Sequence, residues 1–190
     1  MRIYFLRHAE TQGNLERRYI GGRTDEPLSG EGKTHAALRR DLPALRRVYV
    51  SPMKRAAQTA EIFFPDAELV PVEGLREMDF GDFEGKNADE MKDDPAYRAW
   101  VDSGCEDACP GGEDMKTYRE RACAGFFEAV AAAEKDGADE TAVVAHGGTI
   151  MAVMSRFGVP ERRYFDWRVS NCGGYLVETE GKRLRLLKEL

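Results

Sequence analysis

The sequence predicts an α/β protein: a three-layer sandwich with a mostly parallel central sheet, helices on both faces and a small helical cap insertion. Four short apolar segments, at residues 2–6, 47–50, 68–72 and 141–145, have the length and composition of buried strands. Segments with helical spacing separate most of them, and strands that alternate with helices are typical of parallel sheets. The 190 residues are expected to form a single domain, 1–190.

The composition is that of a globular protein, with 42% hydrophobic residues, 33% charged residues and a net charge of −6. Because polyanions are held by clustered positive charge, no binding to nucleic acid or to a membrane surface is expected. The first apolar run is closed by Arg7 and is too short for an export signal or a membrane-spanning helix. The four cysteines show no metal-finger spacing, so reduced thiols and a cytoplasmic location are predicted.

The second strand is expected to lead into a helix at 52–64. Ser51 has the side chain of a helix cap, and Pro52 suits the first helical position, where the missing N–H would have no partner anyway. An earlier helix, at 31–40, carries His35 as an exposed or half-buried residue. A longer helix is expected at about 113–135, where apolar residues repeat every three or four positions.

Two further segments complete the predicted fold. Strands at 174–178 and 183–187, joined by a turn at Glu180 and Gly181, are expected to add to the edge of the sheet in antiparallel fashion. Residues 81–112 are acidic and interrupt the alternation of strands and helices, which predicts a helical cap insertion over a site. The aromatic residues around this insertion are expected mainly to pack it onto the domain: Phe80, Phe83, Tyr97 and Trp100.

Two of the three histidines, His8 and His146, directly follow predicted buried strands. The carboxyl ends of neighbouring strands in an open α/β sheet form the ligand crevice, so these side chains are expected to converge. Arg7 and Arg55 add two cations at the same edge, and an arginine fork matches the oxygens of a phosphate. Gly147 opens the next helix, where backbone N–H groups can face an anion.

Three separate motifs, in this order along the chain, resemble the histidine phosphatase superfamily, the phosphoglycerate mutase-like group. They are Arg-His-Ala-Glu-Thr at 7–11, Ser-Pro-Met-Lys-Arg-Ala-Ala-Gln-Thr-Ala at 51–60 and His-Gly-Gly at 146–148. The resemblance implies a phosphoric monoester hydrolase in which His8 attacks phosphorus to give a phosphohistidine that water hydrolyses. It also implies that Arg7, Arg55 and His146 surround the phosphoryl oxygens, with no metal and no cofactor.

The resemblance further assigns a proton donor to the leaving group. Glu77, in Leu-Arg-Glu-Met-Asp-Phe-Gly at 75–81, matches the acidic position of the family and is expected to act as general acid and then as general base. Its neighbours Asp79, Asp82 and Glu84 are expected to be solvated.

Weaker parts of the resemblance concern substrate contacts. Thr11, Asn14 and the backbone of Gly147 match positions that the family uses for further phosphate or substrate binding. One departure is Ala9, where the family has a glycine after the nucleophile. A residue with a Cβ at this position perturbs the loop only if the backbone needs a positive φ or a very close approach.

Within the superfamily, the sequence favours hydrolysis of a small phosphorylated metabolite. The chain lacks the length for the additional segments with which cofactor-dependent mutases keep water from the phosphohistidine. The Glu-Met-Asp-Phe-Gly-Asp-Phe-Glu-Gly stretch at 77–85, followed by Pro-Gly-Gly-Glu at 110–113, resembles the α-ribazole phosphatase subgroup. This subgroup implies α-ribazole 5′-phosphate as substrate and a place in cobalamin biosynthesis, and a mutase-like enzyme or a sugar-phosphate phosphatase is the alternative. A monomer and a homodimer are both compatible with the sequence.

Two interpretations from other classes stay open. A metal-dependent hydrolase would use His8, Glu10, Asp79 and His146 as ligands, although the two nearby arginines would repel a divalent ion. A catalytically silent phosphate-binding protein would keep the scaffold without turnover.

Overall fold

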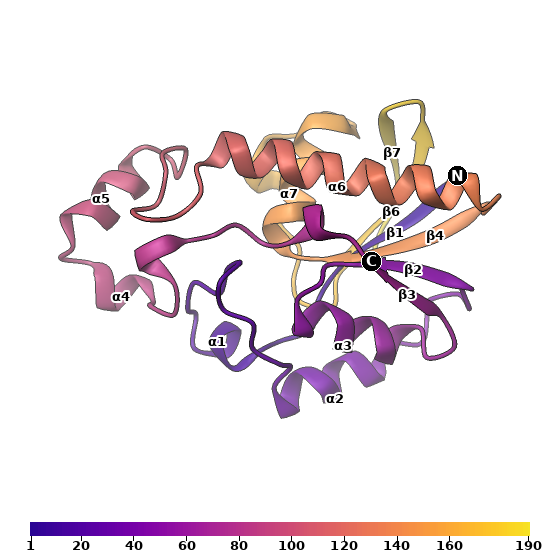
Figure 1. Ribbon diagram of the computed structural model, residues 1–190, viewed down its shortest axis with the longest axis horizontal. Coiled ribbons are helices and arrows are strands. Elements are labelled where there is room, and N and C mark those ends of the chain that lie inside the picture. The colour runs from indigo at the N-terminus through magenta and orange to yellow at the C-terminus, as the bar shows by residue number, and fades with distance from the viewer.

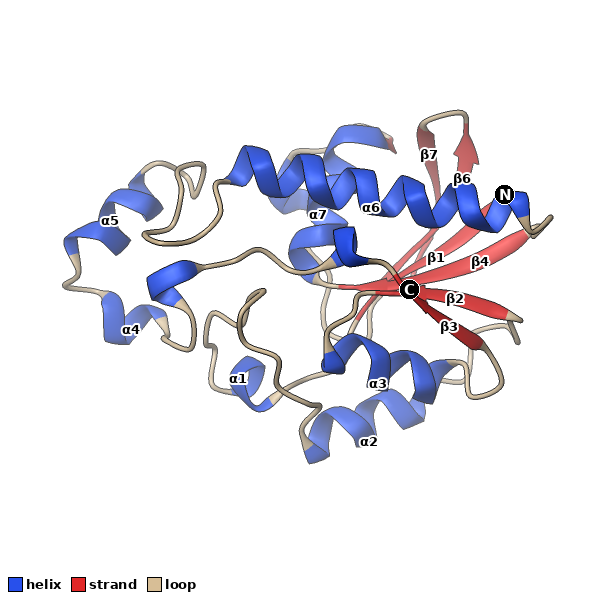
Figure 2. Ribbon diagram, viewed as in Figure 1, coloured by secondary structure: helices blue, strands red, loops and turns tan.

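A seven-stranded sheet forms the centre of the computed structural model, which describes all residues from Met1 to Leu190 (Figure 2). The order of its strands is β3-β2-β4-β1-β6-β7-β5. In chain order the strands are β1 (Arg2–Arg7), β2 (Arg47–Val50), β3 (Glu68–Pro71), β4 (Glu140–Ala145), β5 (Gly158–Val159), β6 (Gly174–Glu180) and β7 (Arg183–Glu189).

The pairing of the strands confirms the predicted mostly parallel sheet. Strand β1 pairs in parallel with β4, with Arg7 opposite Ala145, and β2 pairs in parallel with both β4 and β3. The two C-terminal strands are added in antiparallel fashion, β6 against β1 and β7 against β6, as expected. Because β1, β2 and β4 run in the same direction, the residues that follow them lie at one edge of the sheet.

Helices cover both faces of the sheet, which confirms the predicted three layers. Figure 1 shows α6 and α7 on one side of the strands and α2 and α3 on the other, while α4 and α5 lie beyond the sheet. None of the helices has both the length and the apolar character needed to cross a membrane. The helices are α1 (Gln12–Leu15), α2 (Gly30–Leu38), α3 (Lys54–Phe63), α4 (Ala88–Met91), α5 (Pro95–Asp102), α6 (Met115–Lys135) and α7 (Gly147–Phe157).

Side chains of the central strands point alternately to the two faces of the sheet, and each face has its own hydrophobic core. In β1, Ile3 and Phe5 belong to the core beneath α6 and α7, whereas Leu6 belongs to the core beneath α2 and α3. The ring of Phe5 packs against Phe126 of α6, with 4.7 Å between the ring centroids. Since successive side chains of a strand point to opposite faces, a strand buried on both faces needs a continuous apolar run, as the sequence has here.

The start of α3 differs from the prediction. The helix begins at Lys54, so Pro52 lies outside it, and the position before the helix is held by Met53, whose side chain makes no cap. The first N–H of the helix, that of Lys54, is capped instead by a residue from another loop, since it donates to Oδ1 of Asp25 at 2.7 Å. The cap assignment for Ser51 was therefore wrong, and its hydroxyl contributes to the site described below.

Residues 81–112, predicted as a cap insertion, hold α4 and α5. The two ends of this segment lie side by side, since the N–H of Asp82 donates to the carbonyl of Pro110 at 2.9 Å. Gly81 has a φ of +53°, and a Cβ there would collide with that same carbonyl, so glycine is required at this position. The aromatic side chains of the segment pack in one cluster with part of α6.

Candidate active site

His8 directly follows β1 and is almost fully buried. Its backbone N–H donates to the carbonyl of Ala145 at the end of β4, which ties the two strand ends together. The ring Nδ1 lies 2.7 Å from the carbonyl of Ala9. A carbonyl only accepts, so Nδ1 carries the proton and the lone pair of the neutral ring is on Nε2. The structure thus presents Nε2 as the nucleophilic atom.

His146 follows β4 and packs against His8, with ring centroids 5.1 Å apart. Its Nδ1 accepts a hydrogen bond from Nε of Arg55 at 3.3 Å, which places the ring proton on Nε2. That nitrogen lies 2.7 Å from the hydroxyl of Ser51, at the end of β2. Both ring nitrogens therefore have partners, and a hydrogen bond from His146 to a phosphate would replace the contact with Ser51.

Burial and nearby cations keep both histidines neutral. Burial lowers the pKa of His8 well below its ordinary value, and the positive charges of Arg55 and Arg7 lower it further. The pKa of His146 is lowered in the same way, first by burial and then by Arg55. A neutral imidazole is the nucleophilic form, so the electrostatics of the site favour attack by His8.

Arg55 is fully buried. It donates hydrogen bonds both to His146 and to the loop at residues 20–24. Its two terminal nitrogens donate to backbone carbonyls of residues 20–24: Thr24 at 2.8 Å, Gly21 at 3.1 Å and Ile20 at 3.4 Å. With the bond from Nε to His146, four of the five N–H donors of the guanidinium are engaged. Arg55 therefore contributes mainly its charge and its hold on neighbouring groups.

Arg7 leaves a donor for an anion. One terminal nitrogen donates to the carbonyl of Val169 at 2.8 Å, which fixes the guanidinium. Its Nε is buried and has no hydrogen-bond partner. A Cβ on Gly147 would lie 3.4 Å from this Nε, so Arg7 is beside the first residue of α7. The pairing of a buried arginine with a helix N-terminus matches the charge of a phosphoryl group.

Glu77 is brought to the same edge by the loop after β3. Its Oε1 accepts a hydrogen bond from Tyr118 of α6 at 2.5 Å and another from the N–H of Met78 at 3.0 Å. Its Oε2 accepts from the N–H of Gly148 at 3.4 Å. The backbone of this loop is held by Arg121, which donates to the carbonyl of Arg76 at 2.8 Å. The expected proton donor is thus fixed in place by several groups.

The residues expected to make weaker substrate contacts lie close to His8 but have structural partners. Thr11 and Asn14 form a reciprocal capping box at the start of α1. Oδ1 of Asn14 also accepts from Asn171, which in turn donates to the carbonyl of His8 at 3.0 Å. Ala9 does not have a positive φ and is buried in the core beneath α2 and α3, so the replacement of glycine is mild here.

The acidic residues near Glu77 are not all solvated, as had been expected. Glu84 is half-buried and accepts hydrogen bonds from the hydroxyl of Thr24 at 2.5 Å and from the N–H of Gly21 at 3.1 Å. The carboxylate of Asp79 lies 2.9 Å from Nε of Arg23. These contacts hold the loop at residues 21–24 against the loop that carries Glu77, whereas Asp82 is exposed.

The four ligands of the metal-dependent alternative do not come together. Asp79 is paired with Arg23, and Glu10 is directed to His35, whose Nδ1 is 2.9 Å away. The groups of potential ligands with metal-binding separation do not include His8 or His146. The donor set that this hypothesis requires is therefore not assembled.

A largely apolar cavity of about 440 Å³ adjoins the proposed acid. Glu77 and Gly148 form one side of it, and Arg168 is its other charged lining residue. The volume falls within the usual range for small-molecule sites, about 300 to 1,000 Å³. Most of the remaining lining is aromatic: Tyr19, Phe80, Tyr97, Trp100, Tyr118, Tyr164 and Phe165.

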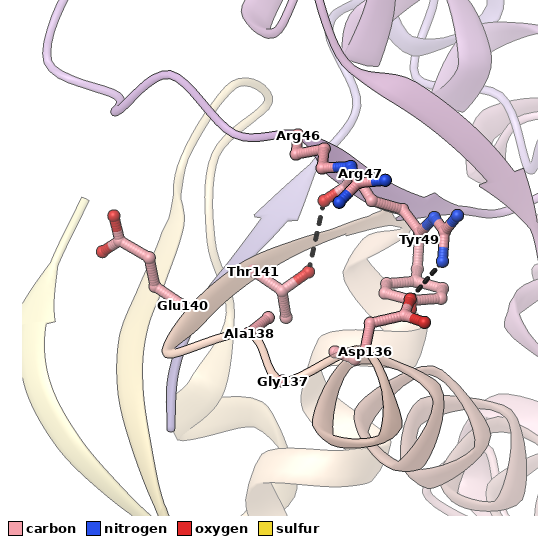
Figure 3. Close-up of a pocket in the computed structure, with 9 residues that line it drawn as sticks. Arg46, Arg47, Tyr49, Asp136, Gly137, Ala138, Glu140 and Thr141 are labelled. Carbon is pink, nitrogen blue, oxygen red and sulfur yellow. Dashed lines mark hydrogen bonds and ion pairs between the residues drawn. The ribbon is translucent and has the colours of Figure 1, made fainter.

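Another hollow, of about 330 Å³, lies at the opposite ends of the strands (Figure 3). Its wall includes Arg47 and Asp136, which form an ion pair, and Thr141, whose hydroxyl donates to the carbonyl of Arg47 at 3.4 Å. None of the residues expected to carry chemistry lines it. It is separate from the candidate active site.

The sequence interpretation missed two residues of the site. Ser51 had been read as a helix cap, and Tyr118 belonged to the apolar stripe of the long helix. Both interpretations depend only on neighbouring residues in the sequence. The hydrogen-bond partners of Ser51 and Tyr118, which are His146 and Glu77, are far away in the chain. A polar hydroxyl within an otherwise apolar stripe was the one available hint for Tyr118.

Comparison with known proteins agrees with this geometry. The family model "Histidine phosphatase superfamily (branch 1)" matches residues 3–189. "Probable phosphoglycerate mutase GpmB" of Enterobacter sp. (strain 638) is 30% identical over 181 residues, which cover 90% of this chain and 82% of the relative. "Putative phosphoserine phosphatase 2" of Hydrogenobacter thermophilus is 29% identical over 195 residues, 98% of this chain and 93% of the relative.

Among solved structures, the alpha-ribazole phosphatase from Shigella flexneri has a TM-score of 0.84 at 22% identity and covers 98% of this chain and 95% of its own. At this identity the likeness shows the shared fold. The family match, in contrast, spans nearly the whole chain and includes the strand-end histidines and arginines. The chain is therefore an enzyme of the phosphatase type and belongs to the histidine phosphatase superfamily (branch 1).

Proposed function

We propose that this enzyme is a metal-independent phosphomonoesterase that acts on a small metabolite whose alcohol carries an aromatic ring, for which α-ribazole 5′-phosphate is the candidate. The observation that carries the proposal is the aromatic cavity beside Glu77. A place in cobalamin biosynthesis and a cytoplasmic location belong to the same proposal, and the four unpaired cysteines fit a reducing compartment.

The reaction proceeds in two displacements. Nε2 of His8 attacks phosphorus, the ester P–O bond breaks, and Glu77 gives its proton to the leaving oxygen. Water then attacks the phosphohistidine, its proton passes to Glu77, and the N–P bond breaks to release inorganic phosphate. Arg7 and Arg55 supply positive charge that is positioned before the reaction and stabilises the transition state.

The shape and chemistry of the cavity support an aromatic ring on the alcohol of the ester. Glu77 lines this cavity and also a polar hollow of about 510 Å³ that holds Arg23, Arg76 and Arg121. An ester whose leaving oxygen is next to Glu77 can extend into either one, and an aromatic ring on its alcohol suits the aromatic cavity. Aromatic side chains pack favourably against the face or edge of a bound ring. The rings of Tyr19 and Trp100 already pack against each other in such a T-shaped arrangement. Segment 81–112 supplies part of this wall, as expected for a cap.

A phosphoglycerate mutase is the second candidate, since a relative at 30% identity has that name. Phosphoglycerate is small and carries a carboxylate besides its phosphate. Arg168 is the one cation among the lining residues of the cavity, and an apolar wall gives a second anion little compensation for lost hydration. The cavity therefore favours hydrolysis of a larger and less polar ester.

The test is phosphate release in excess EDTA from α-ribazole 5′-phosphate, an aryl phosphate, phosphoserine, 3-phosphoglycerate and a sugar bisphosphate. We expect a higher kcat/KM for α-ribazole 5′-phosphate than for phosphoserine, 3-phosphoglycerate and the sugar bisphosphate, and no release by His8→Ala. The aryl phosphate, which needs little help from an acid, is the reference for the phosphohistidine chemistry. Equal slow rates on all substrates would withdraw the aromatic assignment. Formation of 2-phosphoglycerate would favour the mutase, and no release from any ester would favour a silent phosphate-binding protein.

A further inference from the structure

Three side chains with the character of metal ligands lie together outside the catalytic cavity: His35 is exposed, Glu10 is half-buried and Cys172 is buried. One carboxylate oxygen, one ring nitrogen and the sulfur all lie within 4.8 Å of one another. Nδ1 of His35 is 2.9 Å from Oε1 of Glu10 and 3.1 Å from Oε2. We propose that these three side chains bind one divalent transition-metal ion of the Zn²⁺ type.

The donor set suits such an ion. Zn²⁺ binds a thiolate at about 2.3 Å and imidazole or carboxylate at about 2.0 to 2.2 Å, so its ligand atoms lie about 3 to 4 Å from one another. Small side-chain movements bring the three atoms to these separations. A sulfur, a nitrogen and an oxygen together favour zinc, cobalt or copper over magnesium and calcium. A thiolate and a carboxylate also balance the two charges of the ion.

The surroundings allow an ion to enter. A hollow of about 370 Å³, lined in part by His35 and Cys172, opens beside the cluster. Arg39 and Arg40 also line this hollow, and the charge of Arg39 is paired with Asp41 at 2.7 Å. Arg39 also donates to the carbonyl of Cys172, which fixes the guanidinium on the backbone of the turn that holds the sulfur. Three protein ligands leave a fourth position for water.

The proposed site is connected to the nucleophile through the backbone. Glu10 is two residues from His8, and the N–H of Cys172 donates to the carbonyl of His8 at 3.3 Å. His35 belongs to α2, so a bound ion would join the loop after β1, helix α2 and the turn before β6. An ion that binds only the folded protein stabilises it, which predicts a higher Tm when the metal is present.

The experiment uses the full chain after removal of metal by a chelator, with a phosphine reductant, and titrates it with Co²⁺. Thiolate ligation gives cobalt an absorption band in the near ultraviolet, which reports on Cys172 without any enzyme assay. We expect one equivalent to bind, Zn²⁺ to displace it, and either metal to raise Tm. Cys172→Ala removes the band. His35→Gln, which changes an exposed side chain, weakens binding by about tenfold or more, a loss that even outer-shell changes can produce.

Cys123→Ala is the matched control, because Cys123 is also buried but lies in the opposite core. This variant should keep the band, the affinity and the rise in Tm. If the wild type shows neither band nor change in Tm, Glu10 and His35 form only a hydrogen bond with each other and the proposal is wrong. It is equally wrong if His35→Gln or Cys172→Ala binds as tightly as the wild type. No substrate is used, so the outcome is independent of the proposed function.

Discussion

The hydroxyl of Tyr118 lies 2.5 Å from Oε1 of Glu77, and both side chains are buried. Tyr118 comes from α6, whereas the donor to the other carboxylate oxygen, the N–H of Gly148, comes from α7. The orientation of the carboxyl group therefore depends on how these two helices pack. Arg121, one turn after Tyr118 on α6, holds the backbone of the same loop through the carbonyl of Glu77 at 3.3 Å.

We expect Tyr118→Phe to slow the enzyme mainly on esters with poor leaving groups. As Glu77 gives up its proton it gains negative charge, and a hydrogen bond to a charged group is worth about 1.5 to 3 kcal/mol, so without Tyr118 kcat on an alkyl phosphate should fall about tenfold or more. An activated aryl phosphate needs little help from an acid and should lose much less. Steady-state kinetics on both esters, with Glu77→Gln for comparison, measure this difference.

Tyr175→Phe is the control, since Tyr175 is a buried tyrosine of β6 outside the site. An equal loss on alkyl and aryl esters would show that Tyr118 does not act through the acid.

Gly148→Ala should reduce activity by crowding the same carboxyl group. A Cβ at this position would lie 2.6 Å from Oε1 of Glu77 and 2.7 Å from the hydroxyl of Tyr118, so both must move. Displacement of a reacting group by about 1 Å can cost about 100-fold in rate. Gly30→Ala, at the first position of α2 with nothing within 4 Å of the new Cβ, is the matched control. Wild-type kcat in Gly148→Ala would contradict the close approach.

The sequence was sufficient for six of the seven strands, all but the two-residue β5, and for the strand-end residues. Each central strand is a short apolar run followed at once by a polar residue, and the parallel order then brings His8 and His146 to one edge. It was insufficient for Ser51, because a serine and a proline after a strand satisfy a local rule for helix starts. The actual partner, His146, is brought near only by the pairing of β2 with β4.

Ser51→Ala tests whether the hydroxyl positions His146. The change leaves the ring Nε2–H buried without its partner, which costs about 1 to 3 kcal/mol. We expect a lower free energy of unfolding in urea and a lower kcat, because the ring is no longer fixed beside His8. Ser155→Ala, which removes a hydroxyl bonded only to the backbone of its own helix, should change neither quantity by much. Unchanged kcat in Ser51→Ala would separate Ser51 from catalysis.

Arg55→Ala should lower kcat and raise KM together. The variant loses charge near the phosphoryl group, and it also frees residues 20–24, whose carbonyls the guanidinium holds. Arg55→Lys keeps the charge but not the fork, so we expect it to recover part of kcat. A rise in KM alone in Arg55→Ala would limit Arg55 to ground-state binding.

The stability of the protein should fall in mild acid because of His8 and His146. Burial and the nearby arginines lower the pKa of both rings well below 6.5, whereas in the unfolded chain they titrate near 6.5. As the pH falls below about 6.5, the unfolded state takes up protons at these rings that the folded state does not. The free energy of unfolding then drops by about 1.4 kcal/mol per pH unit for each ring, and the stabilisation is complete only above the unfolded pKa.

Urea unfolding in EDTA at several pH values between 5 and 7.5 measures this slope. His146→Asn should reduce the slope, even if it also lowers stability at neutral pH, because the contribution of His146 is removed and that of His8 remains. If the slope of His146→Asn equals that of the wild type, His146 is protonated in the folded protein, and the neutral ring that donates to Ser51 and accepts from Arg55 is not its resting form.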